Sequence, residues 1–210
     1  MKTRSVVSAV LLASTLAVPV AATAATKGKQ KAPAAAPAAA AMDSADESRI
    51  KRGLEISPVP LNLAGRNRAL VGLGSYIVNA QAGCNDCHTW PNFADGGDPY
   101  RGQPKMINAE HYLAGGRPFG PFRSRNITPD PSSTMTTEEK YQEFVSIFRT
   151  GLDPDLAHPQ FGPFLQVMPW SVYQDMTERD LRAIFEYLQA IPHADPVCTG
   201  AQGEPAFCFP

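Results

Sequence analysis

The chain has 210 residues, and its 19 Lys and Arg residues nearly balance its 20 Asp and Glu residues, which gives a formal net charge of −1. This balance excludes the strongly basic surface that nucleic-acid binding requires, so no nucleic-acid partner is expected. The 20 prolines and 16 glycines favour helices with long irregular connections over a large sheet.

Residues 1–25 have the three parts of a cleaved secretory signal peptide. Lys2 and Arg4 form a cationic head, an apolar stretch runs from Val6 to Val20, and small residues then supply an Ala-x-Ala step. The apolar stretch is shorter than the ~20 residues that span a bilayer. We therefore expect a periplasmic protein with no transmembrane segment after signal cleavage and a net charge near −3 once Lys2 and Arg4 are removed; an uncleaved membrane anchor is the alternative.

Residues 26–48 are rich in Ala and Pro and lack large apolar side chains, so they predict a solvated linker. The remaining residues 49–210 suffice for one hydrophobic core and thus one domain. Its first predicted helix lies in residues 66–83, where Leu70, Leu73 and Ile77 share a face. Gly72 and Gly74 each weaken a helix by roughly 1 kcal/mol relative to alanine, which indicates close approach by another helix, expected to be the last one.

The segment Cys84-Asn85-Asp86-Cys87-His88 is the most informative motif. A structural zinc site needs four ligands, and no second ligand pair with suitable spacing follows. A thioredoxin-type dithiol would need a preceding strand and a following helix, whereas a helix precedes and a loop follows. Haem fits each residue, because the two-residue spacer suits the two vinyl groups and the adjacent histidine can bind iron. We expect one covalent haem c, with thioethers to Cys84 and Cys87 and His88 as the proximal ligand.

Residues 136–151 predict a second helix, with Tyr141, Phe144 and Phe148 on one face. Thr136 and Glu139 are spaced as a capping box, and Gly151 is placed to end the helix.

The second axial ligand is sought downstream of His88. Met168 lies in an apolar segment whose regular helix is interrupted by Pro169, so its thioether could be held on irregular backbone facing the iron. A core-filling role for this methionine is the alternative. His158 and His111 are the other candidate ligands, and His193 is expected at the surface.

A last helix is predicted in residues 176–192, with Thr177 as its cap, Leu181 and Ile184 among its inward residues, and Pro192 at its end. Cys198 and Cys208 then close a short loop at the C-terminus. In an oxidising compartment this pair predicts a disulfide.

Taken in order, these features resemble the class I cytochrome c superfamily. They are more closely similar to the cytochrome c modules of bacterial periplasmic dehydrogenases, such as alcohol dehydrogenase cytochrome subunits. The resemblance covers about residues 70–192 and rests on residues 84–88, 126–130, 168–170 and 176–181. It implies an all-α, haem-wrapping bundle of three to five helices, with Met168 as the distal ligand. It also implies that the turn from Asn126 to Pro129 packs against the haem edge.

The chain departs from those subunits in one respect, since they carry three haem modules and it has one CxxCH segment. The resemblance therefore indicates a monohaem protein, and neither a multi-haem wire nor a di-haem peroxidase. More than 120 residues follow His88, which disfavours the five-coordinate, four-helix cytochromes that attach haem near the C-terminus.

Iron bound by both histidine and methionine has no open position for a substrate, so electron transfer is the expected function. Expected partners are redox proteins: a dehydrogenase, an oxidase or another cytochrome. The alternatives are a haem enzyme or gas or redox sensor with a labile sixth ligand, and a subunit permanently docked on a larger enzyme. Arg123 and Arg125 are candidate partners for the haem propionates.

Overall fold

The computed structural model describes residues 44–153 and 159–197, all of which lie in one compact unit. The predicted signal peptide, the linker up to residue 43, His158, Cys198 and Cys208 lie outside the described residues. The signal peptide and the disulfide therefore stay predictions.

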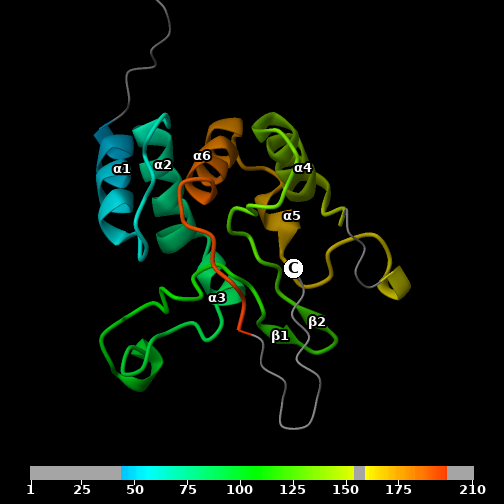
Figure 1. Cartoon of the computed structure of the whole chain (residues 1–210), viewed down its shortest axis with the longest axis horizontal. Helices are drawn as coiled ribbons and strands as arrows, with labels where there is room; N and C mark the ends of the chain where they lie inside the picture. The colour runs from blue at the N-terminus through cyan, green and yellow to red at the C-terminus, as the bar shows by residue number, and fades with distance from the viewer. Residues whose placement is uncertain (1–43, 154–158, 198–210) are drawn as a thin grey trace, which may run out of the picture. The chain divides into compact units, whose positions relative to one another are not determined.

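Helices dominate the described residues and are accompanied by one two-stranded sheet, which confirms the predicted helical fold (Figure 1). The described residues form six α-helices, more than the three to five expected, because the count includes two short helices of five and four residues, α3 and α5. The elements are α1 (Ser44–Ile56), α2 (Arg68–Tyr76), the π-helical η1 (Ile77–Gln81), α3 (Cys84–His88), η2 (Pro99–Arg101), β1 (Pro118–Phe119), β2 (Phe122–Arg123), α4 (Thr137–Thr150), η3 (Pro159–Phe161), α5 (Trp170–Tyr173) and α6 (Glu178–Leu188).

Helices α2, α4 and α6 form where the sequence predicts them, and local capping explains their ends. The Thr136 hydroxyl accepts a hydrogen bond from the Glu139 amide while the Glu139 carboxylate accepts one from the Thr136 amide, so the predicted capping box is present. Gly151 ends α4 in the left-handed conformation at φ +69°. The Thr177 hydroxyl accepts from the Asp180 amide and caps α6.

Helix α1 was not predicted, and it starts inside the range assigned to the linker. Its sequence carries little apolar surface: Ile50 is buried, whereas Leu54 is half-buried. Contacts with other helices compensate, because the buried Asp46 carboxylate pairs with Arg179 of α6 in addition to its local bond with Arg49, and Gly53 packs against Gly72 of α2. These contacts are tertiary, so hydrophobic periodicity could not reveal the helix.

Helix α2 lies between α1 and α6 (Figure 1). A Cβ atom on Gly74 would be 1.9 Å from the Ala183 carbonyl oxygen, which confirms the expected approach of the last helix. For Gly72 that expectation is wrong. Its Cβ would be 2.7 Å from the Ile50 carbonyl oxygen, so its neighbour is α1.

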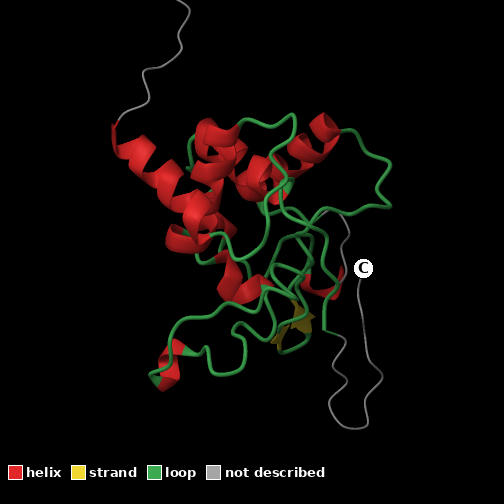
Figure 2. Ribbon diagram, turned by 60° about the vertical axis from the view of Figure 1, so that its left-hand side comes forward, coloured by secondary structure: helices red, strands yellow, loops and turns green. Residues whose placement is uncertain are grey.

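The hydrophobic core is built mainly by α2, η1 and α6, and Tyr112 and Leu113 add to it from the loop after η2. Figure 2 shows the longer helices gathered in the upper part of the view, with the loops and the small sheet below them. Among the helices described here, none is both long and apolar enough to cross a membrane. The buried apolar side chains at the centre include Val71, Leu73, Ile77, Val78, Tyr112, Leu113, Leu181, Ile184, Tyr187 and Leu188.

Candidate functional site

The two cysteines and the histidine of the CxxCH segment lie on the short helix α3. Gly83 starts it at φ +65°, a left-handed conformation that glycine adopts without strain. A spacing of three residues places Cys84 and Cys87 one helical turn apart on one face, and both side chains are half-buried. Helical backbone precedes α3 and a loop follows it, which disfavours the strand-and-helix setting of a thioredoxin-type dithiol.

The two thiols have raised pKa values, whereas the thiols of a reactive dithiol have lowered ones. Burial raises the pKa of Cys84 to about 12. Burial also raises the pKa of Cys87, against the opposing charge of the nearby Arg117 guanidinium. Redox-active cysteines instead have pKa values lowered to roughly 3.5–7.5. Within residues 44–153 and 159–197, no three His, Cys, Asp or Glu side chains are grouped as metal ligands.

His88 is held by a backbone carbonyl from a distant part of the chain. Its Nδ1–H donates a hydrogen bond to the Arg125 carbonyl oxygen at 2.8 Å. Burial lowers the pKa of His88 and outweighs the opposing effect of this hydrogen bond, so the ring is neutral at pH 7. With the proton on Nδ1, the lone pair on Nε2 remains for a metal. A ring fixed through its other nitrogen in this way is the usual arrangement of a metal-binding histidine.

The backbone around Gly115 keeps Arg125 in place. The Gly115 amide donates to the His88 carbonyl oxygen at 2.7 Å. A Cβ atom on Gly115 would lie 2.4 Å from the Arg125 carbonyl carbon, and φ at this residue is +78°. Nearby, the fully buried Thr89 hydroxyl accepts from the Leu113 amide at 2.9 Å. Glycine is therefore required where these three chain segments meet.

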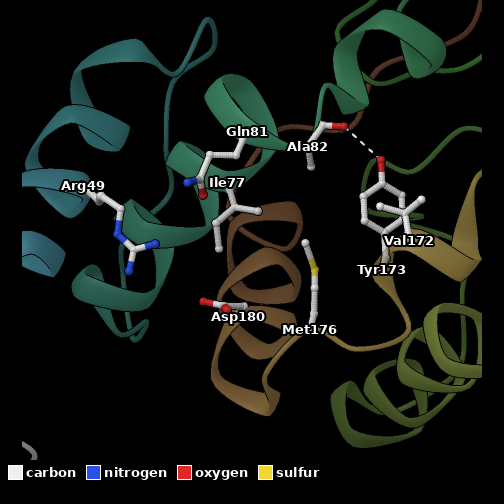
Figure 3. Close-up of a pocket in the computed structure, with 8 residues that line it drawn as sticks. All are labelled: Arg49, Ile77, Gln81, Ala82, Val172, Tyr173, Met176 and Asp180. Carbon is white, nitrogen blue, oxygen red and sulfur yellow. Dashed lines mark hydrogen bonds between the residues drawn. The ribbon is translucent and has the colours of Figure 1, made fainter.

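Met168 lies on irregular backbone just before α5, as the sequence predicts, but the segment is not buried as expected: the Met168 side chain is half-buried and its neighbour Val167 is exposed. Helix α5 lies beside the start of α3, because the Tyr173 hydroxyl donates to the Ala82 carbonyl oxygen at 3.0 Å (Figure 3). Burial and, secondarily, the nearby Cys84 and Cys87 raise the pKa of Tyr173, which agrees with this placement. The structure thus brings the methionine segment and the CxxCH helix to neighbouring positions.

The chain around Met168 presents an unusual amount of exposed apolar surface. Five large apolar side chains between residues 152 and 172 have exposed fractions of 40–72%. Exposed clusters of this kind mark binding surfaces. A flat apolar group with one edge at the cysteines and an iron for His88 fits this donor set and this surface. The five side chains are Leu152, Phe161, Phe164, Val167 and Val172.

The other candidate ligands have partners of their own. The His111 Nδ1–H donates to the Asp195 carbonyl oxygen at 2.8 Å. His193 is exposed, as predicted, and its Nδ1–H donates to the Pro129 carbonyl oxygen at 2.9 Å. The side-chain Nδ2 of Asn126 donates to the Ala194 carbonyl oxygen at 2.8 Å, so the turn from Asn126 to Pro129 packs against the segment after α6.

The two candidate arginines have different surroundings. The Arg123 guanidinium donates to the Gly116 carbonyl oxygen at 3.2 Å. The Arg125 guanidinium forms an ion pair with Asp153. The contribution of Arg125 to the site that the structure describes is thus its backbone carbonyl, which binds His88.

Sequence reasoning missed Arg117, Gly115, Thr89 and Tyr173. The Arg117 guanidinium lies 5.5 Å from the centres of the Trp90 and Phe119 rings and influences the pKa of Cys87. The adjacent glycines before Arg117 are the one local signal that could have indicated this close approach. The roles of the others depend on partners far away in the sequence.

Comparison with known proteins relates the chain to cytochrome subunits of dehydrogenases. It is 31% identical over 120 residues to the fructose dehydrogenase cytochrome subunit of Gluconobacter japonicus, which covers 57% of this chain and 21% of that protein. It is 26% identical over 129 residues to the cytochrome c subunit of the quinone alcohol dehydrogenase of Gluconacetobacter polyoxogenes, covering 60% of this chain and 25% of that protein. A nicotinate dehydrogenase subunit of Pseudomonas putida is 28% identical over 137 residues, covering 65% of this chain and 10% of that protein.

The chain therefore spans a quarter or less of the length of these curated relatives. No protein-family model and no solved structure matches it. The similarity to cytochrome subunits agrees with the resemblance inferred from the motifs.

Proposed function

We propose that residues 49–210 form a monohaem c-type cytochrome domain that an N-terminal signal peptide directs to the periplasm. The domain transfers single electrons between a dehydrogenase or quinol-oxidising complex and a terminal acceptor. The observation that carries this proposal is the geometry of His88, whose ring is neutral and bonded through Nδ1 to Arg125. That arrangement leaves Nε2 for iron, on the same short helix as two thiols.

Each residue then has a defined role. Cys84 and Cys87 form the two thioether bonds to haem c, His88 is the proximal ligand and Met168 the distal ligand. Bound haem supplies a reversible one-electron couple, whose potential is higher with His and Met ligands than with two histidines. The apolar side chains around Met168, which are exposed without a cofactor, would cover a bound porphyrin and keep water from it. Arg123 and Arg125 are proposed partners of the propionates, and the turn from Asn126 to Pro129 a neighbour of the haem edge.

Two occupied axial positions leave no place for a substrate, so the domain acts as an electron carrier and not as an enzyme. The names of the similar proteins support a dehydrogenase as the electron donor, because two of them are cytochrome subunits of dehydrogenases. A carrier that shuttles between partners needs weak, short-lived complexes, which bury less than about 1,200 Å². Co-purification with a dehydrogenase would instead indicate a permanent subunit.

The covalent assignment is tested by intact-mass spectrometry of the protein from a host that matures c-type cytochromes. We expect a coloured product that is heavier than the processed apoprotein by one haem. Cys84→Ala and Cys87→Ala should each leave one thioether bond. The haem should then stay attached to the protein during acid-acetone extraction, and the α-band of the reduced protein should shift because one vinyl group is unsubstituted. A colourless product of apoprotein mass overturns the proposal.

The distal ligand is tested by the near-infrared sulfur–iron absorption band of the oxidised protein. Met168→Ala should abolish this band and open the reduced protein to carbon monoxide. Met106→Ala is the matched control, because its side chain is 43% exposed and Met106 precedes the apolar segment. If the unaltered protein lacks the band and binds carbon monoxide quickly, the sixth ligand is labile and a gas sensor or haem enzyme replaces the electron carrier.

A further inference from the structure

We propose that Tyr173 is a positioning residue that fastens the Met168 segment to the start of the CxxCH helix. The inference rests on the proposed function, because it assigns Tyr173 the task of keeping Met168 at the iron. Its basis is the hydrogen bond from the Tyr173 hydroxyl to the Ala82 carbonyl oxygen at 3.0 Å, which spans 91 positions in the sequence. Ala82 lies directly before Gly83 and Cys84, so the bond joins the two halves of the site.

Two short hydrogen-bonded turns connect Met168 to helix α5, which contains Tyr173. The Trp170 amide donates to the Met168 carbonyl oxygen at 2.8 Å, and the Val172 amide donates to the Pro169 carbonyl oxygen at 2.9 Å. Pro169 restricts the backbone of Met168 further. A displacement of Tyr173 is therefore transmitted to the methionine.

On its other side α5 is fixed to α4 by packing. The Phe148 and Tyr173 ring centres are 5.7 Å apart, and the Trp170 ring covers Gly151, where a Cβ atom would be 2.2 Å from it. These contacts set the position of α5 against α4 and not against α3. Within the described residues, no hydrogen bond other than the one from Tyr173 to Ala82 joins α5 to residues 77–88.

Packing does not fill the space next to this bond. A pocket of about 230 Å³ that is open to solvent adjoins Tyr173, with Ile77 and Met176 among the side chains around it (Figure 3). A helix that borders such a pocket has room to shift once its hydrogen bond is lost. The strength of the bond to Ala82 thus decides how firmly Met168 is held.

The test uses Tyr173→Phe in the haem-loaded protein, which removes the hydroxyl and keeps the ring. Carbon monoxide competes with Met168 for the reduced iron, so its apparent affinity reports the fraction of protein in which the methionine is detached. Loss of one hydrogen bond should raise that affinity about fivefold, equivalent to about 1 kcal/mol. The amides of Trp170 and Val172 should also exchange hydrogen faster, a readout that does not depend on the haem.

Tyr100→Phe is the matched control, because Tyr100 is 87% exposed and its ring contact with Phe93 survives the change. It should behave as the unaltered protein in both measurements. Equal carbon monoxide affinity and equal exchange for Tyr173→Phe and Tyr100→Phe overturn the proposal while leaving the ligand assignment intact. If Met168→Ala retains the sulfur–iron band, the ligand assignment itself fails, and the role of Tyr173 fails with it.

Discussion

Gly74 of α2 and Ala183 of α6 lie in such close contact that a Cβ atom on the glycine would be 1.9 Å from the alanine carbonyl oxygen. The same Cβ would be 2.8 Å from the Tyr187 Cβ. The two helices carry much of the buried core, and η1 continues α2 to within three residues of the start of α3. The packing of α2 against α6 therefore positions the CxxCH segment relative to the core.

Gly74→Ala should destabilise the protein by roughly 1–3 kcal/mol, because the added methyl group has no space. An alanine inside an unconstrained helix would instead stabilise it by roughly 1 kcal/mol, so the sign of the change separates packing from propensity. Urea unfolding followed by circular dichroism measures it. Ser146→Ala on the exposed side of α4 is the control and should stay within about 0.5 kcal/mol. A stabilised Gly74→Ala would show that α2 and α6 are farther apart.

Asp46→Asn should lower the free energy of unfolding at pH 7 by roughly 1.5–3 kcal/mol, the usual contribution of hydrogen bonds to a charged group. The hydrogen bond from Arg49, together with Arg179, holds the pKa of Asp46 below its ordinary value of 3.8 despite burial. A folded-state pKa that is lowered stabilises the fold above pH 3.8, and this contribution is lost as the pH falls through the folded value.

The difference between the unaltered protein and Asp46→Asn should therefore be constant near neutrality and shrink below about pH 4. Glu47→Gln is the control, since Glu47 is an exposed carboxylate in the same first turn of α1. It should change stability by no more than about 0.5 kcal/mol. A difference for Asp46→Asn that persists unchanged at pH 3 would contradict the role of its charge.

Gly115→Ala should disturb His88 through the backbone of Arg125. The new Cβ would lie 2.6 Å from the Arg125 carbonyl oxygen that accepts the Nδ1 proton. A weaker hydrogen bond makes the imidazole a less basic ligand, so the oxidised iron is stabilised less and the reduction potential should rise. Redox titration of the haem-loaded protein measures this shift.

Gly116→Ala is the control for that measurement. Gly116 is also left-handed, at φ +85°, but its Cβ would meet no atom closer than 3.5 Å. Both variants carry the backbone strain, and only Gly115→Ala displaces Arg125. Equal potentials in the two variants would refute the link between this carbonyl and the histidine.

Thr89→Val should destabilise the protein by roughly 1–3 kcal/mol, because it leaves the buried Leu113 amide without its acceptor. Thr89→Ser keeps the hydroxyl and should retain the bond, at a smaller cost from the lost methyl group. Thermal unfolding of the two variants ranks them. A valine variant that is as stable as the serine variant would mean that the amide finds another partner.

The CxxCH segment and the helices α2, α4 and α6 could be predicted from the sequence because their determinants are local. A capping box needs Thr136 and Glu139 three positions apart, and the left-handed end of α4 needs a glycine directly after Thr150, which is Gly151. The cysteine spacing and the adjacent histidine likewise form within α3. Such patterns fix dihedral angles and hydrogen bonds over a few residues, without reference to the rest of the chain.

The tertiary structure alone decided what surrounds those residues. His88 donates a hydrogen bond to the carbonyl oxygen of Arg125, 37 positions away. The Arg125 guanidinium, which the sequence analysis singled out as a candidate partner of the haem propionates, instead pairs with Asp153. Helix α1 and the neighbour of Gly72 also depend on contacts between distant segments. A backbone carbonyl is present at every residue, so no sequence pattern distinguishes the one that will accept a hydrogen bond. The folded chain determines that this carbonyl is the one of Arg125. Gly115 has no side chain, so the backbone of Arg125 can come close enough to bind the histidine.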